Sequence, residues 1–349
     1  MLRTKVASAM LAGSLLFSAG ALAASAALTQ NAPALMGEVP GAEKIQVNIT
    51  DGQIDTITGV IYRQVKSLRN MAQLRMTLMI PRNAAKKPAI VYLPGGGFTS
   101  ADWDKFTEMR YALTRAGFVV AAAEYRPVPV KFPGLVEDAR AAVRYIKAHA
   151  DELGVDPTRV GVLGDSAGGY LAEMLAMIKG ESGWDKGENL NVSGDVAAAV
   201  SLYGLSDLTS IGEGLSENAQ RVHESPAVTE ALLVNGVAFR DYPGASIFSD
   251  KEKALAASPI GHVDGNESPI LLMHGSADAL VSPWQSAHLF EALKKKNANV
   301  EYVLVEGAGH GDLTWYQASI IERVVTYFKK TLGAPTPAKA EKPNANGNL

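Results

Sequence analysis

The chain has 349 residues with a formal net charge of −3, 47% hydrophobic residues and no cysteine. The lack of thiols excludes disulfide bonds, thiolate metal sites and a lipobox, so a large hydrophobic core has to stabilise the fold. The weak charge, without a run of about five like charges, argues against nucleic acid or anionic lipid as a partner. We therefore expect a small molecule or a neutral polymer as the ligand.

The first residues have the pattern of a bacterial secretory signal peptide. Arg3 and Lys5 precede an apolar run over 6–19, and Ala21-Leu22-Ala23 supplies a small-x-small cleavage pattern. We expect cleavage after Ala23, with a second candidate site after Ala26. Cleavage after Ala23 makes 1–23 the signal peptide, and we expect the mature protein to be periplasmic or secreted. No later segment reaches about 18 uninterrupted apolar residues, so we expect no membrane association after the signal is removed.

The next part of the chain is rich in short strand patterns. Segments 53–65 and 71–80 are β-branched or alternate apolar and polar residues, which predicts an antiparallel edge pair. Six later segments are apolar at nearly every position, which is typical of parallel strands buried on both faces. These six segments are 89–93, 118–123, 160–163, 197–202, 270–273 and 300–305.

Amphipathic helical patterns lie between these strands. They cover 106–116, 135–149, 168–178, 283–295 and 314–332. Alternating strands and helices predict an α/β fold with a mostly parallel, doubly wound sheet of eight strands.

One domain over 45–332 accounts for the pattern, with two exceptions. The interval of about 205–257 breaks the alternation, with Gly, Ser, Glu and Asp scattered among short apolar pieces, and we interpret it as an inserted cap or lid. Segment 333–349 consists largely of Ala, Pro, Lys and Asn with almost nothing to bury, which predicts a disordered tail.

The strongest chemical motif surrounds Ser166. An apolar strand over 160–163 continues into Gly164-Asp165-Ser166-Ala167-Gly168 and then into an apolar helix, the context that a G-x-S-x-G nucleophile turn requires. Gly164 and Gly168 let the strand and the helix pass closely, while the turn exposes the Ser166 hydroxyl. The alternative is an ordinary serine in a glycine-rich turn.

A serine nucleophile needs a base, and His310 follows the last predicted strand in Gly309-His310-Gly311. His274 is the main alternative to His310 as the base because it ends a strand. It precedes the candidate acid in the sequence, however, whereas a site built on this nucleophile turn has the order serine, acid, histidine along the chain. We expect the other four histidines to be structural or solvent-facing. They are His149, His223, His262 and His288.

The acid has to orient the imidazole and stabilise its protonated form. Asp278 follows a buried strand by a few residues and is the preferred candidate. Asp207 is the alternative, since it follows the neighbouring strand, although a turn or helix cap explains it better.

A glycine loop, Gly95-Gly96-Gly97, follows the strand over 89–93 and predicts an oxyanion hole. The backbone amides of Gly96, Gly97 and Ala167 are the expected donors. Phe98 and Trp103 are candidates for the substrate-binding pocket, with plain core packing as the alternative.

Together these motifs resemble the α/β-hydrolase superfamily over about 58–328, and within it the bifunctional feruloyl and acetyl-xylan esterases and, more distantly, the hormone-sensitive-lipase-like esterases. Arg126 and Asp138 are further points of similarity, which we interpret as a structural ion pair. One departure is Pro94, where the family usually has His, so the loop must be anchored differently here.

The resemblance implies a serine carboxylic-ester hydrolase that forms an acyl-enzyme through Ser166, His310 and Asp278. The implied substrate is a small-molecule or polysaccharide-linked ester, and no metal or organic cofactor is expected. Two alternatives remain: an amidase or peptidase of the formamidase or prolyl-oligopeptidase type using the same triad, and a non-catalytic binding module on the same fold.

Overall fold

The computed structural model describes residues 35–49, 52–67, 69–82 and 85–333. The predicted signal peptide over 1–23 and nearly all of the predicted tail, 334–349, lie outside the described residues. The chain divides into a unit before residue 51 and a unit from residue 51 onward. In the first unit, the described residues 35–49 form turns without a helix or strand.

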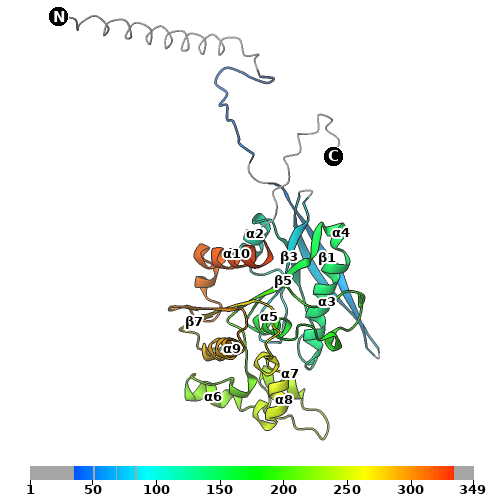
Figure 1. The fold of residues 1–349 in the computed structure, drawn as a ribbon, viewed down its shortest axis with the longest axis vertical. Coiled ribbons are helices and arrows are strands. Elements are labelled where there is room, and N and C mark those ends of the chain that lie inside the picture. Colours follow the sequence, from blue (N-terminus) through cyan, green and yellow to red (C-terminus); the bar gives the residue numbers. More distant parts are fainter. Residues whose placement is uncertain (1–34, 50–51, 68, 83–84, 334–349) are drawn as a thin grey trace, which may run out of the picture. The chain divides into compact units, whose positions relative to one another are not determined.

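Eight strands of the described chain form a single sheet in the order β1-β2-β4-β3-β5-β6-β7-β8. Figure 1 labels β1, β3, β5 and β7 of this sheet. The pairs β1–β2 and β2–β4 are antiparallel, and the remaining pairs are parallel. This arrangement confirms the predicted α/β-hydrolase fold. The strands are β1 Ile54–Lys66, β2 Met71–Pro81, β3 Lys87–Leu93, β4 Val119–Ala123, β5 Val155–Asp165, β6 Ala198–Leu202, β7 Ile270–Gly275 and β8 Val300–Val305.

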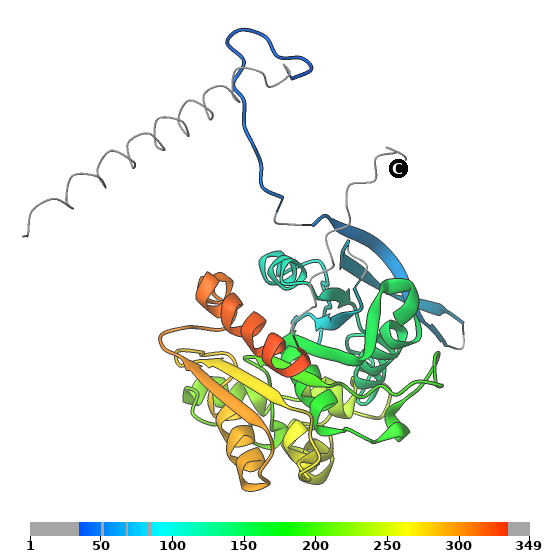
Figure 2. The same cartoon turned by 45° about the horizontal axis from the view of Figure 1, so that its top comes forward.

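Helices cover both faces of this sheet, as the continuous apolar strands require. In β3, Val91 belongs to one buried cluster and the adjacent Ile90 to the other, because successive side chains point to opposite faces. Helices α2 and α10 pack in the Ile90 cluster and lie on one face (Figure 2), while α3, α5 and α9 contribute to the Val91 cluster. Their bounds are α2 Thr107–Arg115, α3 Gly134–Ala148, α5 Ala167–Met177, α9 Trp284–Lys295 and α10 Ala318–Leu332, and the short α4 covers Ala150–Leu153.

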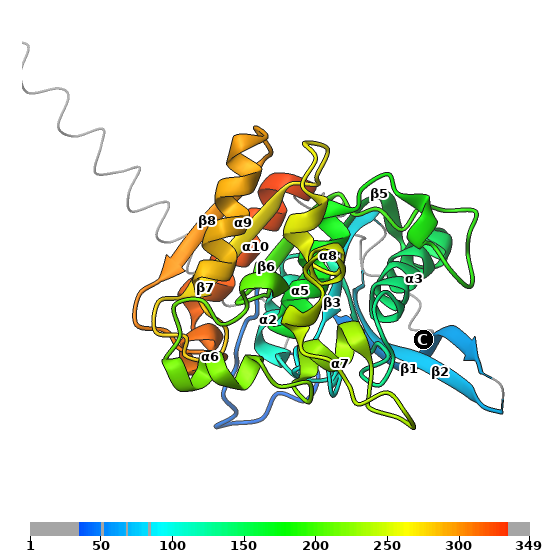
Figure 3. The ribbon, with the colours of Figure 1, turned by 90° about the horizontal axis from the view of Figure 1, so that it is seen from below.

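The predicted insertion lies between β6 and β7 and consists of short helices and turns. Figures 1 and 3 show α6, α7 and α8 gathered at one end of the second unit. They cover α6 Glu217–His223, α7 Thr229–Asn235 and α8 Lys251–Ala256. The described 3-10 turns are η1 Ser182–Trp184, η2 Leu208–Ser210, η3 Ile247–Ser249, η4 Pro259–His262 and η5 Leu313–Tyr316.

The last predicted helix, 314–332, begins four residues later than expected. Asp312 accepts a hydrogen bond from the Thr314 amide at 2.8 Å and caps the 3-10 turn η5. Gln317 then has an extended backbone and separates this turn from α10. Helical spacing alone did not distinguish a capped turn followed by a helix from one continuous helix.

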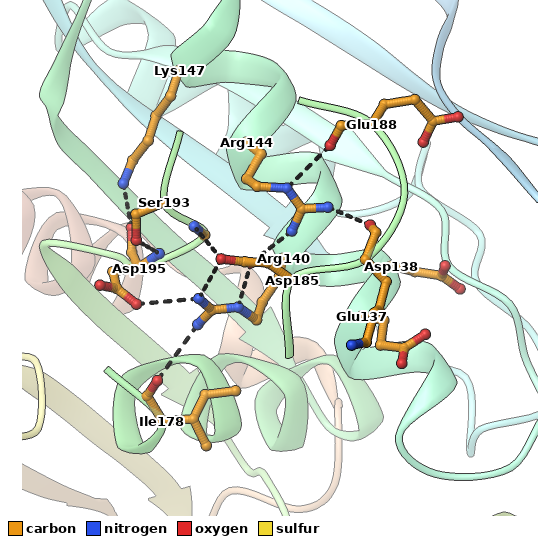
Figure 4. Close-up of polar contacts among 12 residues, drawn as sticks. Glu137, Asp138, Arg140, Arg144, Lys147, Ile178, Asp185, Glu188, Ser193 and Asp195 are labelled. Atoms are coloured by element: carbon orange, nitrogen blue, oxygen red, sulfur yellow. Dashed lines mark hydrogen bonds and ion pairs between the residues drawn. The ribbon is translucent and has the colours of Figure 1, made fainter. Parts of the chain in front are cut away.

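A buried network of charges attaches the loop between α5 and β6 to helix α3 (Figure 4). Arg140 and Arg144 of α3 are fully buried, and both donate to Asp185, with Arg140 Nε and Arg144 Nη1 2.8 Å and 2.6 Å from Oδ1. Asp138, near the start of the same helix, pairs with Arg126, which precedes the helix: Arg126 Nε lies 2.7 Å from Asp138 Oδ2, as the sequence predicted. These pairs have a structural explanation, since buried charges require partners.

No helix in the described part of the chain is both long and apolar enough to cross a membrane.

Candidate active site

Ser166 lies at a sharp turn between β5, which ends at Asp165, and α5, which begins at Ala167. Its backbone angles, φ 53° and ψ −119°, fall in a region that non-glycine residues rarely occupy, so the turn is strained. A Cβ at Gly164 would lie 1.9 Å from the Gly168 carbonyl oxygen, and one at Gly168 would lie 1.9 Å from the Leu93 carbonyl oxygen. Only glycine fits at both positions, as the motif predicted.

The three predicted triad side chains form one chain of hydrogen bonds. His310 Nε2 lies 2.9 Å from Ser166 Oγ, and His310 Nδ1 lies 2.7 Å from Asp278 Oδ2. With the proton on Nδ1 donated to the carboxylate, Nε2 is free to accept the serine proton. The geometry is therefore that of an activated serine.

Asp278 is held as a charged, immobile acceptor. Its Oδ1 accepts from the amides of Leu280 and Val281, both at 2.9 Å. Burial alone would raise the pKa of the Asp278 carboxyl, but hydrogen bonds from His274 and His310 hold this pKa well below its usual range. Asp278 is therefore ionised and able to stabilise an imidazolium at His310.

His274, the competing base, supports the acid instead. It is fully buried, with Nδ1 2.8 Å from Ser286 Oγ and Nε2 3.0 Å from the Val281 carbonyl oxygen. Nε2 is also 3.4 Å from Asp278 Oδ2. Because two acceptors face Nε2, this nitrogen carries the proton and His274 donates toward the acid. Among the described residues, no hydrogen bond joins His274 to Ser166.

The loop that carries His310 is fixed by residues that the sequence motifs did not identify. The Tyr203 ring meets the His310 imidazole edge to face, with ring centroids 4.8 Å apart. Trp315 Nε1 donates to the Gly309 carbonyl oxygen at 2.8 Å, and the Gly309 amide donates to Asp312 Oδ2 at 2.6 Å. A tyrosine directly after β6 was the available signal, since that strand end adjoins β7 in the sheet.

The predicted oxyanion donors lie in the turn beside the nucleophile. Among the described residues, the amides of Gly96 and Gly97 have no protein acceptor, and the Ala167 amide opens α5. The Gly96 carbonyl oxygen accepts from the amides of Thr99 and Ser100, which closes the turn. Gly97 and Ala167 line a cavity together with Ser166, whereas Gly96 is not among its lining residues.

The glycine loop is anchored by contacts that do not use a side chain at position 94, where the sequence led us to expect a different anchor. Tyr125 donates its hydroxyl to the Pro94 carbonyl oxygen at 2.7 Å. The Gly95 amide and the Tyr92 hydroxyl both donate to Asp165 Oδ1, at 3.0 Å and 2.8 Å. The middle residue of the Gly-Asp-Ser motif thus anchors the glycine loop next to Ser166.

The cavity beside Ser166 has a volume of about 100 Å³. Phe98 lines it, as predicted from the sequence, and also meets Tyr170 edge to face with ring centroids 5.3 Å apart. Trp103 is not among the lining residues and packs against the cluster on the α2 and α10 face. The other lining residues come from the oxyanion loop, the nucleophile turn, the insertion and the acid loop: Gly97, Ala167, Leu205, Ile211, His223, Thr229, Glu230, Leu280 and Val281.

The remaining candidates have other functions in the fold. Asp207, the alternative acid, accepts from the Thr209 amide at 2.8 Å and caps η2. Within the described residues there is no group of three or more His, Asp or Glu side chains that could hold a metal ion.

Comparison with known proteins agrees with this fold. The BD-FAE family model matches residues 76–293. The probable carboxylic ester hydrolase LipM of Mycobacterium tuberculosis is 25% identical over 60% of this chain and 45% of its own length. The ethyl acetate hydrolase of Pseudomonas putida is 28% identical over 67% of this chain and 68% of its own length. The chain spans about half the length of LipM and of the esterases LipQ and LipC from the same organism.

Solved structures show the same architecture. Thermogutta terrifontis esterase 2, phosphonylated by sarin, superposes with a TM-score of 0.62 at 26% identity, over 87% of this chain and 99% of that chain. A truncated form of a carbohydrate esterase from gut microbiota, at 23% identity, superposes with a TM-score of 0.67 over 80% of this chain and 96% of that truncated chain, which supports the fold alone. The family model covers more than half of the chain, and the protein belongs to the BD-FAE family of α/β-hydrolases.

Proposed function

We propose that this protein hydrolyses carboxylic esters with Ser166 as the nucleophile. The observation that carries the proposal is the hydrogen-bonded series Asp278, His310 and Ser166, with spacings of 2.7 Å and 2.9 Å. It lies beside a cavity that Gly97 and Ala167 line. The carboxylic ester hydrolases among its relatives support the same reaction class.

In this mechanism His310 removes the Ser166 proton while the serine oxygen attacks the ester carbonyl. The amides of Gly97 and Ala167, with Gly96 beside them, stabilise the negative charge on the tetrahedral oxygen. Asp278 stabilises the imidazolium, which then gives its proton to the departing alcohol. Water hydrolyses the acyl-enzyme with His310 as the base, and the serine is regenerated.

The size of the cavity favours a small acyl group such as acetyl. Its volume of about 100 Å³ lies below the roughly 300 Å³ at which sites for larger organic ligands begin. Acetate esters of small alcohols or of polysaccharides meet this limit, whereas a feruloyl group needs more room. The ethyl acetate hydrolase among the relatives acts on an ester of this size by its name.

Two measurements test the proposal. A fluorophosphonate probe should label the wild-type protein at Ser166, identified by peptide mass spectrometry, and should not label Ser166→Ala. No labelling of the wild type would remove the basis for a serine hydrolase. The ratio of kcat/KM for p-nitrophenyl acetate to that for methyl ferulate should then exceed about 100, with Ser166→Ala as the blank, and comparable values would refute the small-acyl assignment.

We also propose export to the periplasm or the medium, on the basis of the basic start, the apolar run and the Ala21-Leu22-Ala23 pattern. Expression in a Gram-negative host should yield a mature protein that begins at Ala24. Mass spectrometry of the protein from the periplasmic fraction measures this, and an intact Met1 in the cytoplasmic fraction would contradict it.

A further inference from the structure

The insertion places a second carboxylate and imidazole pair in the cavity beside Ser166. His223 is the last residue of α6 and Glu230 lies in the first turn of α7. Their side chains meet with Nδ1 2.5 Å from Oε1, and both residues line the same cavity as Ser166. The mechanism above uses neither of them.

The location of Glu230 is unusual for a carboxylate. Its side chain is 6% exposed, and its neighbours in the cavity include Leu205, Ile211 and Val281. Burying a charge among apolar groups is unfavourable unless hydrogen bonds compensate for the lost water. Among the described residues, Oε1 has the imidazole of His223, while Oε2 has only the hydroxyl of Thr229 at 3.4 Å. A carboxylate accepts about four hydrogen bonds, so Glu230 retains acceptor capacity.

The hydrogen bond to Glu230 also determines which ring nitrogen of His223 is left to accept a hydrogen bond. When Nδ1–H donates to Glu230, the neutral imidazole presents a lone pair at Nε2. Nε2 has no hydrogen-bond partner among the described residues. It is also not buried, so it is accessible to another molecule. Both members of the pair therefore present an acceptor, and a hydroxyl, which has one hydrogen to donate, complements the accessible Nε2 of His223.

We propose that His223, oriented by Glu230, accepts a hydrogen bond from a hydroxyl group of the substrate, and that the preferred esters carry this hydroxyl on the acyl or the alcohol portion close to the ester bond. This inference rests on the proposed function at Ser166. The cavity of about 100 Å³ holds only a few non-hydrogen atoms, which limits the hydroxyl to a few bonds from the carbonyl carbon.

The test compares three esters of similar size: ethyl acetate, ethyl glycolate with a hydroxyl on the acyl group, and 2-hydroxyethyl acetate with a hydroxyl on the alcohol. The variant is His223→Asn, because the asparagine amide nitrogen takes the place of Nδ1 and keeps the bond to Glu230 while Nε2 is removed. His288→Asn is the matched control: His288 Nδ1 lies 3.8 Å from Glu213 Oε2, and His288 is not among the cavity-lining residues.

The readout is kcat/KM of each hydroxyl-bearing ester divided by kcat/KM of ethyl acetate. His223→Asn should lower this ratio about tenfold for the ester whose hydroxyl is bound, the equivalent of one lost hydrogen bond, and His288→Asn should not change it. A fall for ethyl glycolate alone assigns the hydroxyl to the acyl portion, and a fall for 2-hydroxyethyl acetate alone assigns it to the alcohol.

Unchanged ratios for both hydroxyl-bearing esters in an active His223→Asn variant would overturn the inference. If that variant does not fold, Glu230→Gln, which keeps the side-chain shape, is measured in the same way and decides by the same ratios. The outcome differs from a failure of the proposed function, in which the wild type and Ser166→Ala would hydrolyse ethyl acetate equally.

Discussion

The buried carboxyl of Glu173 makes the stability of the protein depend on pH near neutrality. Glu173 lies on α5, is fully buried, and accepts from the hydroxyls of Ser201 and Ser206 at 2.7 Å and 2.8 Å. Burial raises its pKa from 4.5 to about 7, although the two hydroxyls act in the opposite direction. The difference corresponds to about 3 kcal/mol between the protonation states.

The direction in which the free energy of unfolding changes with pH depends on whether the folded or the unfolded protein holds the Glu173 proton more tightly. Between pH 4.5 and 7 the folded protein retains the Glu173 proton while the unfolded chain has lost it, so the free energy of unfolding falls as the pH rises. Glu173→Gln removes this titration and keeps the shape of the side chain. The stability of the variant relative to wild type should therefore increase by about 2.5 kcal/mol between pH 5 and pH 8.

Urea unfolding of both proteins at the two pH values measures this difference. The contributions of the other titrating groups to the free energy of unfolding cancel, because these groups are present in both proteins. Glu322→Gln, at an exposed position on α10, is the control and should shift stability equally at both pH values. If the difference between Glu173→Gln and wild type is the same at pH 5 and pH 8, Glu173 is ionised in the folded protein throughout this range and the reasoning fails.

Three further substitutions test the site and its support. Asp278→Asn should lower kcat for p-nitrophenyl acetate by about 10³ to 10⁴ without unfolding the protein, because His310 loses the acceptor that sets its tautomer; a change below tenfold would exclude this. Asp185→Ala leaves two buried arginines without their shared partner and should cost about 3 to 5 kcal/mol in urea unfolding, and a cost below 1 kcal/mol would contradict it. Gly95→Ala should lower Tm more than Gly97→Ala, since a Cβ at Gly95 would lie 2.6 Å from the Asp165 carbonyl oxygen, whereas one at Gly97 has nothing within 4 Å and meets only the backbone strain of its positive φ of 56°. Equal Tm values would be evidence against this packing.

The sheet and the meeting of the triad side chains were predictable because each depends on local patterns. A strand buried on both faces is apolar at every position, and the residues that follow parallel strands lie at the same edge of the sheet. Ser166 and His310 are 144 positions apart, but each lies in the turn or loop after a parallel strand, so both are expected at the same edge of the sheet. Their catalytic roles remain predictions until Ser166 and its partners are tested.

The contacts around the site were less predictable because they depend on side-chain packing between distant segments. Nothing in the sequence near Asp165 indicates that its carboxylate anchors the glycine loop, or that Trp103 packs away from the cavity that Phe98 lines. In the insertion, α6 and α7 have only seven residues each, too short for a periodic pattern to show which side faces Ser166.

The two carboxylate and imidazole pairs beside Ser166 differ in what positions them. Asp278 and His310 follow strands of the sheet, whose register is fixed by the buried core, so their geometry is insensitive to changes elsewhere on the surface. His223 and Glu230 belong to short helices of the insertion, where residues change without disturbing the sheet. Because the second pair contacts the same cavity without belonging to the triad, substitutions in the insertion are expected to change which ester is bound while the chemistry at Ser166 stays the same.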